Sequence, residues 1–200
     1  MKAFCTLALC ALLALALSLG FCETGETAEA ADETAQIPEY VFMLTEAEVE
    51  ANKYRIYEFL TLELGFNHAS ACGVMANIDV ESRFDPTAVG DYGTSYGLCQ
   101  WHNKRYDRLI EWSAENDLDY TTLEAQLLYM KYELDNNFAY VFKRMANDIV
   151  NTSRGAYSAG NYWCINYQRP KDKVKRGDAR GELARQKYFS GFIPIFSEDH

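Results

Sequence analysis

The sequence predicts a mainly α-helical fold, with six or seven helices and one small irregular or β segment. Apolar residues recur at helical spacing along most of the chain after residue 45. Thr45 and Thr121 are each followed three residues later by a glutamate, a pair that is typical of a helix start. Pro86 and three glycines interrupt the helical pattern between residues 84 and 103.

The first two helices are defined by their ends. A helix is predicted from Thr45 to about Leu64, where Gly65 is expected to form a left-handed cap. A second helix is predicted over about 69–81 and is rich in small residues that permit close packing. Glu81 closes this helix three residues after Ile78, so we expect it near the inward face.

The middle of the chain should then fold back over the end of the second helix. We expect residues 84–103 to form this irregular or short-stranded segment, with Asn103 capping the helix that follows. The Thr121 capping box should start a further helix. The helices predicted after the irregular segment cover about 103–116, 121–134, 137–150, 153–165 and 178–189.

The chain is expected to have three parts, and only the last, residues 45–200, should be the folded domain. Residues 1–22 combine Lys2 with a long apolar run, which is typical of a signal peptide. The run is also close to membrane-spanning length, and Cys22 has the outline of a lipoprotein modification site. We therefore expect a secreted or cell-envelope protein, with membrane attachment through the N-terminus left open.

The negative charge of the chain is concentrated in its N-terminal part. The whole chain has 19 basic and 29 acidic residues, a net charge of −10. Residues 23–50 hold nine of the acidic residues and none of the basic ones, so without them and Lys2 the remainder is near −2. We interpret residues 23–44 as an acidic flexible linker. This charge argues against nucleic acid as a partner.

The cysteines do not indicate a metal site, because no Cys-x-x-Cys pair is present. Cys72, Cys99 and Cys164 fall in the predicted domain, where one disulfide bond and three buried thiols are both open interpretations. We expect no cofactor and no metal. The sequence carries no signal of oligomeric state.

Two neighbouring segments make the chain recognisable. Residues 73–88 contain Glu81-Ser-Arg-Phe, and residues 90–103 contain Gly-Asp-Tyr-Gly followed by Tyr96-Gly-Leu-Cys-Gln-Trp-His. Together they resemble the phage tail lysozyme domain of the lysozyme-like superfamily, and residues 162–170 resemble its C-terminal segment, with Gln168 where the family pattern has glutamate. The resemblance covers about 54–189 and implies a lysozyme-like fold. Goose-type lysozymes and soluble lytic transglycosylases share this outline.

Glu81 is the candidate general acid. Cleaving a glycosidic bond requires a proton on the leaving oxygen, and a carboxyl group supplies it best where apolar neighbours disfavour its ionised form. We expect Val74, Ile78 and Phe84 to be such neighbours, together with the turn that carries Tyr96 and Trp101. The alternative is a Glu81 that is exposed at the helix end or paired with Arg83.

A second catalytic group is implied by the resemblance. Asp91 stands in a Gly-Asp-x-Gly sequence whose counterpart in goose-type lysozymes positions water, so it would be the base. It could instead hold the turn through its own backbone. His102 occupies a position where those lysozymes have another aspartate, which argues against a two-aspartate arrangement. His102 could act as a base, contact substrate or bond a backbone carbonyl.

The other motif residues are candidates for substrate binding. The amide of Gln100 could bond an N-acetyl group or hold Glu81 in place, and aromatic rings could stack on sugars or belong to the core. A basic run over residues 169–176 could meet anionic wall polymers or form a solvated face. The proposed substrate-binding residues are Ser95, Tyr96, Gln100, Trp101, His102, Trp163 and Tyr167.

The sequence thus predicts an exported muramidase that cleaves peptidoglycan between N-acetylmuramic acid and N-acetylglucosamine. A lytic transglycosylase that forms 1,6-anhydromuramyl products is the alternative within the same enzyme class. A module that binds glycan on the same scaffold without cleaving it is the alternative from another class.

Overall fold

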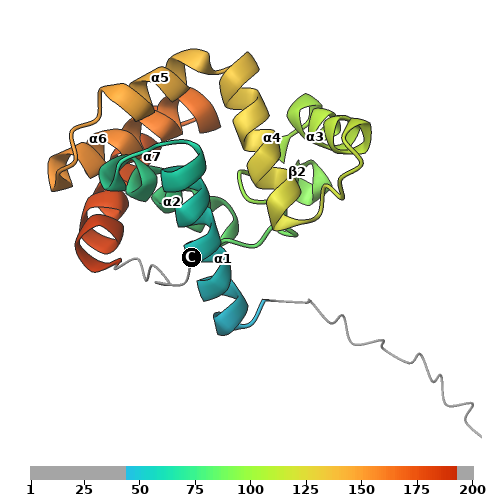
Figure 1. Cartoon of the computed structure of the whole chain (residues 1–200), viewed down its shortest axis with the longest axis horizontal. Coiled ribbons are helices and arrows are strands. Elements are labelled where there is room, and N and C mark those ends of the chain that lie inside the picture. The colour runs from blue at the N-terminus through green and yellow to red at the C-terminus, as the bar shows by residue number, and fades with distance from the viewer. Residues whose placement is uncertain (1–43, 193–200) are drawn as a thin grey trace, which may run out of the picture. The chain divides into compact units, whose positions relative to one another are not determined.

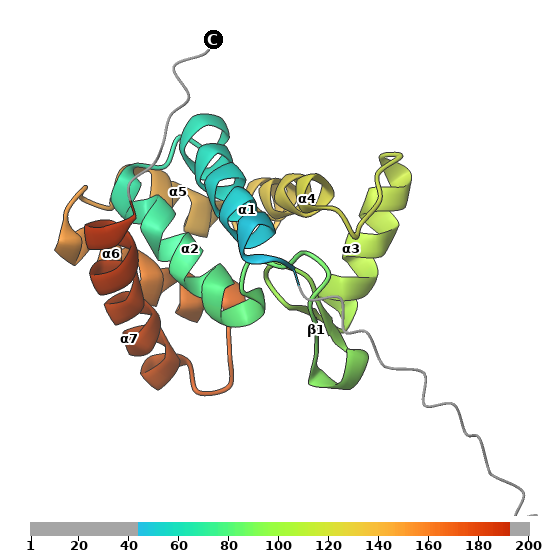
Figure 2. The ribbon, with the colours of Figure 1, turned by 90° about the horizontal axis from the view of Figure 1, so that it is seen from below.

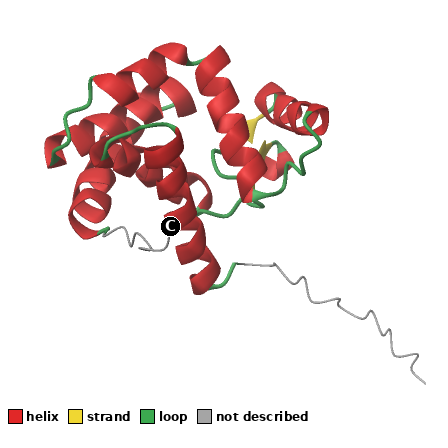
Figure 3. Cartoon of the chain, viewed as in Figure 1, coloured by secondary structure: helices red, strands yellow, loops and turns green. Residues whose placement is uncertain are grey.

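The computed structural model describes residues 44–192 and confirms a mainly α fold with a small antiparallel sheet (Figures 1 and 3). The predicted signal peptide, and the linker up to residue 43, lie outside the described residues. Within 44–192, no helix has the length and apolar character needed to cross a membrane. The helices are α1 Glu46–Glu58, α2 His68–Ser82, α3 Lys104–Glu115, α4 Leu123–Asn136, α5 Ala139–Asn147, α6 Ser153–Trp163 and α7 Lys173–Leu183.

Three of these helices end in a short π-helical segment, in which the backbone winding is wider. These segments are Phe59–Glu63 after α1, Cys164–Gln168 after α6 and Ala184–Phe189 after α7. Figures 1 and 2 place α6 and α7 at one end of the described domain and α3 with the strands at the other, with α4 between them.

The helix starts follow the predicted caps in part. Thr45 and Glu48 form the capping box that the sequence predicts. The cap of α4 is Thr122 and not Thr121, because the Thr122 hydroxyl accepts the backbone N–H of Ala125. Asn103 precedes α3 but makes no side-chain cap bond. Helix α7 begins at residue 173, earlier than predicted.

Helix α2 forms the centre of the core and crosses α6 at close range. A Cβ atom on Gly73 would lie 2.5 Å from the Cβ of Ala159 and 2.6 Å from the backbone nitrogen of Gly160. The side chain of Asn77 donates to the carbonyl of Gly160 at 3.0 Å. The small residues of α2 therefore permit the close packing that the sequence predicts.

The irregular segment between α2 and α3 contains three short strands, β1 Val89–Gly90, β2 Ser95–Tyr96 and β3 Trp101–His102. They pair in the order β1-β2-β3, and all pairs are antiparallel. The register sets Ser95 opposite His102. The turns of this small sheet thus bring the polar residues of the Gly-Asp-x-Gly and Gly-Leu-x-Gln motifs together.

Candidate active site

Glu81 lies in the last turn of α2, where the helix ends in a left-handed bend. Arg83 and Phe84 have φ angles of 55° and 65°, a conformation that side-chain-bearing residues adopt rarely. The Glu81 carboxylate accepts a hydrogen bond from Nη2 of Arg180 at 2.9 Å. The Glu81 side chain is 19% exposed and that of Arg180 is 8% exposed.

This environment differs from the expected one. The partner of Glu81 is Arg180 of α7 and not Arg83. The expected apolar neighbours Val74, Ile78 and Phe84 are buried in the core, but the carboxylate itself meets a cation. Glu81 is therefore held in a half-buried ion pair, and not in an apolar pocket.

Glu81 opens onto a pocket of about 400 Å³, which we call the Glu81 pocket. Three parts of the chain line it: the end of α2, the strand segment and the residues that lead into α7. The structure thus brings five of the nine predicted site residues to one cavity. The lining residues are Glu81, Asp91, Ser95, Cys99, Gln100, His102, Gln168, Arg169, Pro170, Lys171 and Arg176.

Asp91, Ser95 and His102 form a connected polar group in this pocket. The Ser95 hydroxyl donates to Oδ2 of Asp91 at 2.7 Å, and Nδ1 of His102 lies 3.0 Å from the same hydroxyl oxygen. Because the single Ser95 proton is given to Asp91, the contact with His102 requires a proton on Nδ1 of the imidazole. In neutral His102, Nε2 is then the free acceptor, while Asp91 is 73% exposed.

The Gln100 side chain bonds to the backbone of the strand segment and not to Glu81, the candidate general acid. Its Nε2 donates to the carbonyls of Ala88 and Gly97, at 3.1 and 3.0 Å. The Gln100 side chain packs so closely on Gly90 that a Cβ there would collide with its Oε1. The amide nitrogen is therefore engaged by the protein backbone and does not hold Glu81 in place, while a contact of Gln100 with an N-acetyl group stays a prediction.

The structure corrects the expected role of the aromatic residues. Trp101, Trp163 and Tyr167 are 0% exposed, so none of these rings has a face free to stack on a sugar. Tyr96 is also buried and stacks on Tyr106, with ring centroids 5.1 Å apart. These four aromatic residues belong to the core, because their apolar area is buried against neighbouring side chains.

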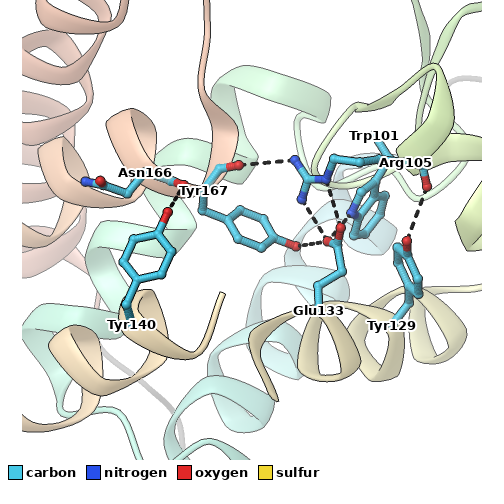
Figure 4. A network of polar contacts seen from close by, with 7 residues as sticks. All are labelled: Trp101, Arg105, Tyr129, Glu133, Tyr140, Asn166 and Tyr167. Atoms are coloured by element: carbon cyan, nitrogen blue, oxygen red, sulfur yellow. Dashed lines mark hydrogen bonds and ion pairs between the residues drawn. The ribbon is translucent and has the colours of Figure 1, made fainter. Parts of the chain in front are cut away.

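The structure also contains a buried polar network that the sequence interpretation missed (Figure 4). The Glu133 carboxylate, 2% exposed, accepts hydrogen bonds from Nε1 of Trp101 and the hydroxyl of Tyr167, both at 2.7 Å. Arg105 donates to it through Nε at 2.8 Å and Nη2 at 2.7 Å. Glu133 follows Met130 by three residues and therefore falls on the inward face of its helix. This position was the sequence signal for a buried carboxylate.

The network joins four segments, two of which also contribute residues to the pocket lining. Trp101 comes from β3, Arg105 from α3, Glu133 from α4 and Tyr167 from the segment after α6. Arg105 also donates to the backbone carbonyl of Tyr167 at 3.1 Å, which ties the two sides of the pocket together. Glu133 thus sets the distance between the strand segment and the residues that lead into α7.

The three domain cysteines are buried free thiols. Burial raises the pKa of Cys72 to about 12 and raises that of Cys164. Burial also raises the pKa of Cys99, which lines the Glu81 pocket. In the part of the chain that the structure describes, no three His, Cys, Asp or Glu residues are placed to hold a metal ion.

Comparison with known proteins connects this site to one family. The family model described as phage tail lysozyme matches residues 51–190, most of the chain. Morphogenesis protein 1 of Bacillus phage B103 is 24% identical over 134 residues, which cover 64% of this chain. The match covers only 36% of that phage protein.

Proposed function

Since the chain belongs to the phage tail lysozyme family, we propose that it is a peptidoglycan hydrolase of the muramidase type. It would cleave the bond between N-acetylmuramic acid and N-acetylglucosamine. The observation that carries the proposal is the position of Glu81, which faces a pocket shared with Asp91 and His102. Because peptidoglycan lies outside the cytoplasm, the proposal also requires export of the chain.

In this mechanism, Glu81 donates a proton to the glycosidic oxygen as positive charge develops on the anomeric carbon. The donor must be protonated at that moment, whereas Glu81 is bound to Arg180 as an ion pair with a 2.9 Å hydrogen bond. The ion pair with Arg180 must therefore open before the proton is transferred. Arg180 is a positioning residue, which orients Glu81 in the state without substrate.

The second group acts from the strand segment. Asp91 is the proposed base that activates water on the far face of the sugar, and Ser95 orients it through the 2.7 Å hydrogen bond. His102 lines the same pocket and is the proposed polar contact for substrate. The alternative is a lytic transglycosylase, in which the muramyl 6-hydroxyl replaces water and no base from the strand segment is required.

Analysis of the released fragments by mass spectrometry tests both mechanisms. Purified peptidoglycan should yield fragments with reducing muramic ends, while 1,6-anhydro products would indicate the transglycosylase. Glu81→Gln should remove fragment release. Asp79→Asn is the matched control, because Asp79 lies on the same helix but pairs with Lys187 at 2.8 Å, outside the pocket lining.

The same material also separates an enzyme from a binding module. A module on this scaffold would be pulled down with peptidoglycan but would release no fragments. The enzyme should release fragments at a rate that depends on Glu81. Pull-down without release by the wild-type chain would refute the proposed activity.

A further inference from the structure

One wall of the Glu81 pocket is cationic. Arg169 and Lys171 line it from the segment that leads into α7, Arg176 lines it from the first turn of α7, and we call these three residues the basic wall. All three are exposed. The whole chain has a net charge of −10, but residues 51–200 are near −2, so this wall is a local concentration of positive charge in a nearly neutral domain.

Within the part of the chain that the structure describes, the cations of the basic wall are not neutralised by a carboxylate. Among the described residues 44–192, none of the three takes part in an ion pair, whereas Arg105 and Arg180 each contact a glutamate. Of the two acidic residues that line the pocket, Glu81 is already paired with Arg180, and Asp91 accepts the hydrogen bond from Ser95. The wall therefore keeps its charge available for a ligand.

The backbone under the basic wall is fixed. Arg169 has a φ angle of 57° and donates its backbone N–H to the carbonyl of Cys164 at 2.9 Å. Its guanidinium lies 5.7 Å from the ring centroid of Phe138. The backbone N–H of Arg176 donates to the carbonyl of Asp172 at 3.0 Å, in the first turn of α7. The cations are thus presented from an ordered segment at a defined side of the pocket.

We propose that the basic wall binds the carboxylates of the stem peptide that peptidoglycan carries on its muramic acid residues. The inference rests on the proposed function, because it assigns a part of the same substrate to this wall. N-acetylglucosamine is uncharged, and muramic acid without its peptide carries only a lactyl carboxylate, whereas the stem peptide carries several carboxylates that extend away from the sugar. Arginine and lysine bind carboxylates through charge-assisted hydrogen bonds. Arginine can donate two parallel hydrogen bonds to the same carboxylate.

The position of the wall gives this contact a consequence for specificity. Glu81 and the basic wall line one cavity, so the bound peptide would lie beside the bond to be cleaved. Glycan with its peptides intact should then be preferred over glycan from which an amidase has removed them. Lys173 and Lys175 belong to the same basic run but do not line the Glu81 pocket, so they provide a matched control.

The experiment measures binding of full-length chain to two glycan preparations, one with stem peptides and one stripped by an amidase. Every chain carries Glu81→Gln, so that cleavage does not enter the result. The parent chain should bind peptide-bearing strands about tenfold more tightly, as three exposed charge contacts would give. Arg169→Gln/Lys171→Gln/Arg176→Gln should lose this preference, and Lys173→Gln/Lys175→Gln should keep it. High salt should reduce it.

The outcomes separate this inference from the proposed activity. Equal binding of both preparations by the parent chain overturns the assignment of the basic wall, even if the wild-type chain cleaves glycan. An equal loss in the triple variant and the Lys173/Lys175 control also overturns it. Peptide-dependent binding that the triple variant loses sustains the assignment, even if the wild-type chain releases no fragments and the proposed activity fails.

Discussion

Arg105 donates two hydrogen bonds to the buried carboxylate of Glu133, from Nε at 2.8 Å and from Nη2 at 2.7 Å. The pair joins α3 to α4. Trp101 and Tyr167 complete the shell of donors around the same carboxylate. Burying a charge in this way is tolerable only when its partners are all present.

Glu133→Gln is therefore expected to destabilise the fold strongly. The substitution replaces an acceptor by an amide group that cannot accept all four hydrogen bonds, and it leaves the partly buried Arg105 without a counter-charge. We expect a loss of about 3 kcal/mol in the free energy of unfolding, measured by urea denaturation. Glu124→Gln is the control, because Glu124 pairs with Arg55 at the surface and should contribute no more than about 1 kcal/mol. Equal losses in the two variants would contradict the role of the network.

The crossing of α2 and α6 leads to a second stability prediction. Gly73→Ala places a Cβ atom 2.5 Å from the Cβ of Ala159 and 2.6 Å from the nitrogen of Gly160. The helices must separate, and we expect a loss of about 1–3 kcal/mol in the free energy of unfolding. Gly191→Ala is the comparison, since a Cβ there meets no atom within 4 Å. Thermal melting that places both variants at the wild-type midpoint would show that the packing is looser than described.

Ser95 provides a test of the strand side of the site. Ser95→Ala removes the hydroxyl that contacts both Asp91 and His102, so both side chains lose their orientation. We expect kcat for peptidoglycan cleavage to fall about tenfold to a hundredfold, because misplaced catalytic groups are costly. Ser158→Ala, which alters an exposed hydroxyl bonded to its own helix, should have wild-type kcat. An unchanged kcat in Ser95→Ala would remove the Asp91 group from the mechanism.

Alkaline pH should destabilise the fold through groups whose charged forms burial disfavours. Burial raises the pKa of Cys72 and of Tyr96 to about 12. The folded state thus holds these protons more tightly than the unfolded state, so the stabilisation is present below about pH 9 and is lost as the pH rises toward 12. The urea midpoint should fall between pH 9 and pH 11, and less steeply in Cys72→Ala. A midpoint that stays constant over this interval would argue against the burial of these groups.

The predicted helices were largely correct because their signals are local. Thr45 with Glu48, and Gly65 after an apolar helix, each determine a helix end from neighbouring residues. The same signal was ambiguous at residues 121 and 122, where two adjacent threonines can each cap a helix and tertiary packing selects Thr122. Local chemistry therefore locates a helix better than it locates its first residue.

The candidate site was predictable only in part. The motif spacing indicated which residues of the strand segment meet Glu81, and the structure brings Asp91, Ser95 and His102 to the same pocket. The partner of Glu81 lies 99 residues away in the chain, and no local pattern connects Arg180 to it. The residue type alone did not distinguish an aromatic ring that stacks on a sugar from one that is buried in the core. Trp101 and Trp163 belong to the core.

The most direct test of the account is the rate at which Glu81→Gln releases soluble fragments from purified peptidoglycan, compared with the wild-type chain. Glutamine keeps the size of the side chain and a hydrogen-bond acceptor for Arg180, but it cannot deliver the proton. The account predicts that fragment release falls to background while the circular dichroism spectrum stays close to wild type; the urea midpoint should fall, because the buried Arg180 loses its charged partner. Release at the wild-type rate from a folded Glu81→Gln chain would contradict the assignment of Glu81 as the general acid.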